Sequence, residues 1–232
     1  MKKIAVVLIA VLSIWACSKE SANTMIVTGK VKGMKKGTLL LQKYNDSLIV
    51  TVDSVNIDGT DEFLLSHEIE SPEIYYLVME NTDKQVSFFG DADSIYVNTQ
   101  LDKFLLKAEI KGGTNQTLWD KYKDVQKKFN NKNLDLIKEQ FEAQQSGSQD
   151  SIDAVEKKLK NWTKKKYLYT TNFAVQNKDH EIAPYLALTE LYNANITLLD
   201  TVNNVLSDEV KASKYGKRLD AFIKEIKAAE SK

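Results

Sequence analysis

The sequence predicts an α+β protein, with an N-terminal antiparallel β-sandwich or open barrel followed by an α-helical region that contains a long antiparallel helical hairpin. Two observations predict this. Up to Gly112-Gly113, apolar and polar residues alternate in short runs, which is the period of a β-strand. From Thr114 onward, apolar residues recur every three or four positions, which is the period of an α-helix. We therefore expect a β-sandwich domain over residues 24–113 and an α-helical domain over residues 114–230.

About eight short alternating segments, separated by Gly, Asn and Asp, make up the first domain. In the clearest of them, Phe63, Leu65, His67 and Ile69 share one face, as a half-buried strand requires. Because no helical pattern separates the segments, antiparallel pairing is favoured over a parallel sheet. The segments are Met25–Val31, Leu39–Leu41, Leu48–Val52, Phe63–Ile69, Ile74–Met79, Val86–Phe89, Ile95–Val97 and Leu106–Ile110.

Two apolar stripes predict the helical hairpin. The first runs from Leu118 to Phe129 and continues weakly at Leu136, with Asn130–Asn133 as a candidate break. The second has heptad spacing from Ile152 to Phe173 and is interrupted only by Lys166. Residues 146–150, Ser-Gly-Ser-Gln-Asp, form the turn between them. We expect the two stripes to pack against each other within one chain, so that the protein is a monomer.

Further helices are predicted near the C-terminus. Pro184 suits the first turn of a helix that runs to about Ala194, and Ser207 and Ser213 are candidate N-caps. Leu219, Phe222, Ile223 and Ile226 would form the buried stripe of the last helix.

Residues 1–16 have the pattern of a bacterial lipoprotein signal peptide. Two lysines precede an apolar run that is shorter than the ~20 residues a membrane-spanning helix needs. The ending Ile14-Trp15-Ala16-Cys17 resembles the lipobox, in which cleavage occurs before the cysteine and the thiol carries a lipid; Ile14 and bulky Trp15 depart from its usual residues. We therefore expect cleavage between Ala16 and Cys17, lipidation of Cys17, and a linker over residues 17–23.

This interpretation places the protein in the bacterial cell envelope, anchored to a membrane by lipid, on the periplasmic or the surface face of the outer membrane. Two alternatives remain open. A plain secretory signal would leave Cys17 as a free terminal thiol, and a retained signal would itself be the anchor.

Composition argues against several functional classes. Lysine and arginine total 32 and so do aspartate and glutamate, so no overall charge attracts nucleic acid. Cys17 is the only cysteine, and its lipidation would leave no thiol for a disulfide, a redox pair, a nucleophile or a thiolate metal site.

Other candidate sites are better explained as structure. His67 and His180 lie far apart in the sequence, and the acidic runs 58–62 and 91–94 do not complete a calcium loop. Trp119 and Trp162 lie on or beside the apolar stripes, which favours core packing over stacking on a sugar. The sequence also lacks a phosphate-binding glycine loop and a Gly-x-Ser-x-Gly elbow. We expect no cofactor, no metal and no catalytic site.

The order of several turn motifs resembles the domain of unknown function 4369. The motifs are Met25–Gly33 with its Gly-x-Val-x-Gly ending, Gly37–Leu41, Val52–Val55 and Gly112–Asn115. This family forms the N-terminal part of many lipoproteins of Gram-negative bacteria. In many of them a helical segment leads into a thioredoxin-like domain with a Cys-x-x-Cys motif. The present sequence has no Cys-x-x-Cys and ends soon after Ile226, so the resemblance implies no catalytic residue here.

Three hypotheses about function follow. The favoured one is an envelope-anchored, non-catalytic binding or scaffolding module for an unknown protein or small ligand. The second is an accessory subunit to a separate thioredoxin-like thiol-disulfide oxidoreductase. The third is an unrecognised hydrolase that uses carboxylates or tyrosines, and this would require a deep pocket with several perturbed acids.

Overall fold

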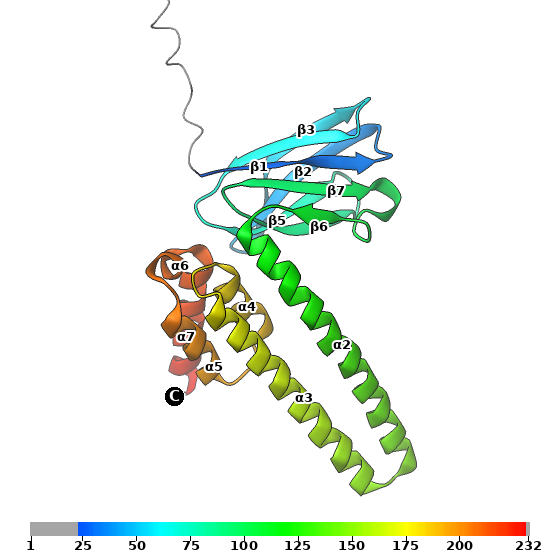
Figure 1. Cartoon of the computed structure of the whole chain (residues 1–232), viewed down its shortest axis with the longest axis vertical. Helices are drawn as coiled ribbons and strands as arrows, with labels where there is room; N and C mark the ends of the chain where they lie inside the picture. The colour runs from blue at the N-terminus through cyan, green and yellow to red at the C-terminus, as the bar shows by residue number, and fades with distance from the viewer. Residues whose placement is uncertain (1–22, 231–232) are drawn as a thin grey trace, which may run out of the picture.

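A computed structural model describes residues 23–230, in which a β-sandwich is followed by a helical region (Figure 1). The predicted signal peptide, its cleavage site between Ala16 and Cys17, and nearly all of the predicted linker lie outside these residues. Within them, no helix combines the length and the apolar character needed to cross a membrane.

Eight strands are present at the predicted segments, and they form two four-stranded sheets. The last strand was predicted from Leu106 but begins at Glu109, because Leu106 lies in the preceding turn, where it is 83 % exposed. One sheet has the order β4-β1-β7-β8 and the other β3-β2-β5-β6. Within residues 23–230 the strands form two sheets and no closed barrel, in agreement with the predicted sandwich or open barrel. The strands are β1 (Thr24–Lys32), β2 (Lys36–Asn45), β3 (Leu48–Asp58), β4 (Glu62–Glu68), β5 (Glu73–Met79), β6 (Gln85–Gly90), β7 (Ser94–Gln100) and β8 (Glu109–Lys111).

One strand pair departs from the predicted antiparallel arrangement. β1 lies between β4 and β7 and runs parallel to β7, with Ile26 opposite Ser94. At Gly29 the two backbones are so close that a Cβ atom would lie 2.0 Å from the carbonyl oxygen of Val97. Alternation within a segment shows which face is buried but not which strand lies beside it, so the sequence did not reveal this pairing.

The predicted alternation accounts for the core of the sandwich. In β4, Phe63 and Leu65 are buried whereas Leu64 between them is 63 % exposed. His67, on the same side, is half-buried and contacts the ring of Tyr75 edge-on, at 5.9 Å between centroids. It is a packed side chain at the edge of the core, as predicted.

The helical hairpin consists of α2 (Thr114–Ser146) and α3 (Gln149–Gln176), joined at the predicted turn. Gly147 adopts a left-handed conformation at the end of α2, with φ of 67°, which glycine allows without strain. The predicted break at Asn130–Asn133 is wrong, because α2 continues through it. Contacts with α3 hold this stretch on both sides: the Trp162 indole donates a hydrogen bond to the carbonyl oxygen of Phe129, at 3.1 Å, and Leu136 is buried.

Four shorter helices complete the chain: α4 (Ile182–Glu190), α5 (Ile196–Val205), α6 (Asp208–Ala212) and α7 (Lys214–Glu230). Ser207 and Ser213 cap α6 and α7 as predicted, since their hydroxyl oxygens accept hydrogen bonds from the backbone N–H of Val210 and Gly216. α4 ends at Glu190 rather than near Ala194, and α5 was not predicted.

The helices cover the outer face of part of the second sheet. Strand β5 is therefore buried on both sides: Tyr75 and Leu77 point into the sandwich, whereas Ile74 contacts the helical side. A cluster of buried residues from both regions forms the junction, and the hairpin extends away from the sandwich (Figure 1). The members of this cluster are Ile74, Phe89, Tyr122, Ile182, Leu186 and Tyr215.

Candidate functional site

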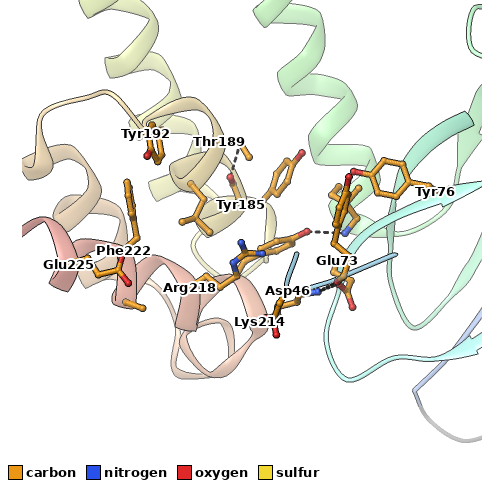
Figure 2. Close-up of a pocket in the computed structure, with 15 residues that line it drawn as sticks. Asp46, Glu73, Tyr76, Tyr185, Thr189, Tyr192, Lys214, Arg218, Phe222 and Glu225 are labelled. Atoms are coloured by element: carbon orange, nitrogen blue, oxygen red, sulfur yellow. Dashed lines mark hydrogen bonds and ion pairs between the residues drawn. The ribbon is translucent and has the colours of Figure 1, made fainter. Parts of the chain in front are cut away.

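A cavity of ≈ 640 Å³ opens at the junction between the second sheet and helices α4 and α7 (Figure 2). Its sheet side comes from the end of β2, the following turn and the start of β5. Its helical side comes from α4, the residues after it, and α7. Aromatic side chains from both sides line it: Tyr44, Tyr76, Tyr185, Tyr192, Tyr215 and Phe222.

A buried ion cluster and a hydrogen bond hold the two sides together. Glu73, at the start of β5, is only 4 % exposed. Its carboxylate accepts hydrogen bonds from the ammonium groups of Lys43, at 2.8 Å, and Lys214. Lys214 also donates to the carbonyl oxygen of Tyr44, and the hydroxyl of Tyr215 accepts a hydrogen bond from the backbone N–H of Ile74, at 3.0 Å. The negative charge of Glu73 is thus neutralised from within the protein.

The aromatic side chains form three pairs. Tyr185 and Tyr215 pack at 5.2 Å between ring centroids, and Tyr44 meets Tyr76 edge-on at 5.7 Å. Tyr192 and Phe222 stack with their rings nearly parallel, 13° apart, at 5.0 Å. Tyr192 remains 60 % exposed and Tyr44 41 % exposed, so ring surface is accessible at the cavity mouth.

Two tyrosine hydroxyls in the cavity have no protein partner. Burial raises the pKa of Tyr185 to about 12, and burial also raises the pKa of Tyr76. Both hydroxyls therefore keep their protons at neutral pH and are able to donate and to accept hydrogen bonds. Within residues 23–230 neither hydroxyl is hydrogen-bonded to another protein group, so both are free to bond a ligand.

Three charged side chains in the lining are also without a partner among the described residues. Arg218 on α7 is the only arginine in the sequence, and it is exposed on the cavity side of its helix. In Figure 2 it lies between Phe222 and Glu73. Asp46, in the turn after β2, and Glu225, farther along α7, carry the opposite charge.

A second polar cluster lies buried beside the junction. The side-chain amide of Asn115, at the start of α2, donates to a carboxylate oxygen of Asp91 and to one of Glu181, at 2.9 Å each. Its oxygen accepts from the backbone N–H of Ile182. Burial raises the pKa of both carboxyls. Because every contact joins one segment to another, this cluster connects the sandwich to α2 and α4.

The structure does not bring the candidate residues from the sequence together. His67 lies in the sandwich and His180 just before α4, and no group of three or more His, Cys, Asp or Glu in the described part of the chain is placed to hold a metal ion. Trp119 packs edge-on against Phe89 and Tyr185, and Trp162 packs against Phe129, so core packing is confirmed for both. Cys17 and Ala16 lie outside the described residues.

Sequence reasoning missed the cavity residues. The tyrosines come from distant segments, and no local pattern shows that they meet. One signal was visible in the composition: of the 32 lysines and arginines, only Arg218 is an arginine. Its neighbours along the helix gave no reason to select it.

Comparison with curated proteins and with solved structures gave no match. A family model does match, over residues 25–119, and its description is Domain of unknown function (DUF4369). The match covers β1 to β8 and the first residues of α2, and it confirms the resemblance found in the turn motifs. Residues 25–119 are thus the part of this chain that is similar to DUF4369, and the cavity lies where that part meets the helical region.

Proposed function

We propose that this protein is a non-catalytic binding module, anchored to a membrane of the cell envelope, whose ligand occupies the cavity between β5, α4 and α7. The observation that carries the proposal is the lining itself: aromatic surface together with hydroxyl, guanidinium and carboxylate groups that no described protein group satisfies. Ligand sites commonly combine a concave aromatic surface with a few polar groups that orient the ligand, and a volume of ≈ 640 Å³ lies within their usual range.

Bonds within the protein also hold the two sides of the cavity together. The bonds from Lys214 to Glu73 and from Ile74 to Tyr215 join α7 to β5 and leave the Tyr185 hydroxyl and the Arg218 guanidinium unbonded among the described residues. A site that already has its bound shape loses less conformational entropy when it takes up a ligand.

The chemistry of the lining favours binding over catalysis. The described residues that line the cavity include neither histidine nor cysteine, and burial raises the pKa of Tyr185 and Tyr215. A general base must be unprotonated at the working pH in order to accept a proton, and these two hydroxyls remain protonated. The one buried carboxylate, Glu73, is occupied by two lysines.

Ligand-observed NMR with a library of small fragments tests the binding site. We expect several fragments to bind the purified protein and to lose binding in Tyr192→Ala, which removes accessible ring surface at the cavity mouth. The matched control is Leu106→Ala, because Leu106 is 83 % exposed on the sandwich, away from the cavity lining. Fragments that bind both variants equally well, or a library without any binder, would contradict the proposed site.

Metabolic labelling tests the anchor. Cells that express the protein are given a radioactive fatty acid, and we expect label in the wild-type protein and none in Cys17→Ala. A wild-type protein without label, or a variant that keeps it, rules out lipidation of Cys17. The cavity proposal does not depend on this result.

A further inference from the structure

We infer that the ligand of the cavity is a neutral carbohydrate, bound as a short oligosaccharide. The inference rests on the proposed function, since it identifies the chemical class of ligand for the same cavity. It follows from which groups the protein leaves without partners.

The unpartnered groups comprise both hydrogen-bond donors and acceptors. Arg218 offers only donors, Asp46 and Glu225 offer only acceptors when ionised, and the Tyr185 hydroxyl offers both. A ligand that satisfies them all must supply acceptors and donors at neighbouring positions. The hydroxyl groups of a sugar do this, because each donates one hydrogen bond and accepts others.

The charge of the lining favours a neutral ligand over an anion. Glu73 is paired with both Lys43 and Lys214, and these three groups carry one surplus positive charge. Arg218 adds one positive charge, and Asp46 and Glu225 add two negative charges, so the groups together have no net charge that would attract an anion. An organic acid bound to Arg218 would also lie in the field of the two carboxylates, and like charges disfavour binding. A sugar without a charged group avoids this cost.

The aromatic surface suits the apolar faces of a sugar ring. A pyranose ring presents C–H groups on its faces and hydroxyls around its rim. Tyr192 stacks on Phe222 with nearly parallel rings, and because Tyr192 is 60 % exposed it keeps accessible ring surface on which a sugar is able to stack. An exposed ring loses water-accessible apolar area when a C–H face covers it, and this stabilises the complex.

The use of arginine at this one position supports the same conclusion. The chain has lysine at the other 31 cationic positions, and every ion pair within residues 23–230 is made by lysine. Lysine thus supplies charge wherever the fold needs it. Arginine adds a rigid, planar set of donors that is able to bond two acceptors at once, such as adjacent hydroxyl oxygens.

A glycan microarray tests the inference. The probes are neutral oligosaccharides, namely glucans, mannans, galactans and xylans, together with oligosaccharides that contain uronic acid. We expect the purified protein to bind at least one neutral class and to prefer it over its acidic counterparts. We expect Tyr192→Ala and Arg218→Lys each to lower the affinity for that glycan about tenfold or more, since each loses a directed contact.

Matched variants separate the site from a general effect on folding. Lys217→Ala removes an exposed cation next to Arg218 on α7 that does not line this cavity, and it should bind the glycan like the wild type. Circular dichroism should show the same unfolding temperature for Arg218→Lys and Lys217→Ala.

Three results would overturn the inference: no glycan bound, binding only to acidic glycans, or binding that Arg218→Lys and Tyr192→Ala leave unchanged. The fragment experiment is independent of these outcomes. If fragments bind in the cavity but no glycan binds, the proposed binding function stands and only the inference of a carbohydrate ligand is wrong.

Discussion

At the scale of single residues, the side chain of Asn115 joins three separate segments of the chain. One amide group satisfies two buried carboxylates and a backbone N–H, and thereby joins the turn after β6 to the beginnings of α2 and α4. Asp91 also accepts from the backbone N–H of Asn115, at 3.1 Å. The sequence showed an asparagine after two glycines at this position, but not the acids from distant segments that it would meet.

Replacing Asn115 by alanine should lower the free energy of unfolding by about 3 kcal/mol, because two buried carboxylates lose a donor. Chemical denaturation measures the change. The matched control is Asn131→Ala on the exposed face of α2, which should stay within about 0.5 kcal/mol of the wild type. Equal changes in the free energy of unfolding for the two substitutions would show that the buried amide contributes no more to stability than an exposed one.

Glu181 gives a prediction about pH. Burial, with the nearby charge of Asp91, raises its pKa, while hydrogen bonds from Asn115 and the charge of His180 act in the opposite direction. The folded protein therefore binds this proton more tightly than the unfolded chain, so this group reduces stability as pH rises from the ordinary value of 4.5 through the raised pKa. We expect Glu181→Gln to be more stable than the wild type at pH 7.5 and the difference to shrink toward pH 4.

Thermal unfolding over this pH range checks the sign. Glu62→Gln is the control, because the hydrogen bond from exposed Lys30 lowers the pKa of Glu62. The stability that Glu62 contributes is present above its ordinary pKa and is lost as pH falls through the lowered value, so its variant should not gain stability at pH 7.5. A Glu181→Gln protein that is no more stable than the wild type at pH 7.5 would refute the argument.

At the scale of elements, the close packing of α6 and α7 depends on a glycine in the first turn of α7. A Cβ atom at Gly216 would lie 2.0 Å from the carbonyl oxygen of Val210. Because the obstacle is backbone, the helices must separate to admit a side chain, and they carry Lys214, Tyr215 and Arg218 of the cavity.

Gly216→Ala should cost about 2 kcal/mol or more in unfolding free energy. Gly147→Ala is the comparison: its Cβ would meet nothing within 4 Å, and its positive φ alone should cost about 1 kcal/mol. Urea denaturation compares them, and a smaller cost at Gly216 than at Gly147 would contradict the steric explanation.

Periodicity predicted the elements whose burial follows from their own pattern. All eight strands, the hairpin and the last helix fall in this group. Periodicity failed where contacts with distant parts of the chain determine whether a segment is helical. Trp162 and Phe129 keep α2 intact through a polar stretch, and α5 was missed although the side chain of Asn195 caps its first turn. The cavity belongs to this second group, because its lining is assembled by tertiary packing.

At the scale of the whole molecule, two neighbouring phenylalanines of β6 face different regions. Phe88 lies in the sandwich core, whereas Phe89 packs edge-on against Trp119, Tyr185 and Tyr215 at the junction. Both are fully buried. Because side chains alternate between the two faces of β6, this one strand contributes to the sandwich core and to the cluster at the junction.

These two residues allow the coupling between the regions to be measured. Phe89→Ala and Phe88→Ala should each cost about 3–5 kcal/mol. In scanning calorimetry we expect Phe89→Ala to divide the unfolding into two transitions, and Phe88→Ala to keep one transition at lower temperature. A single transition in Phe89→Ala would show that the junction does not depend on this side chain.

The central position of β1 has a consequence for the order in which the protein folds. β1 is the first described strand, yet it lies between two later strands, and the hydrogen bond from Lys30 to Asn98 on β7 spans 68 residues. Long loops must close before such contacts form, which slows folding. β4 is made before β7, so β1 at first has a partner along one edge only. We therefore expect the other edge of β1 to remain unpaired and vulnerable to aggregation until β7 has been made, so that a chaperone which holds exposed strands would increase the yield of folded protein.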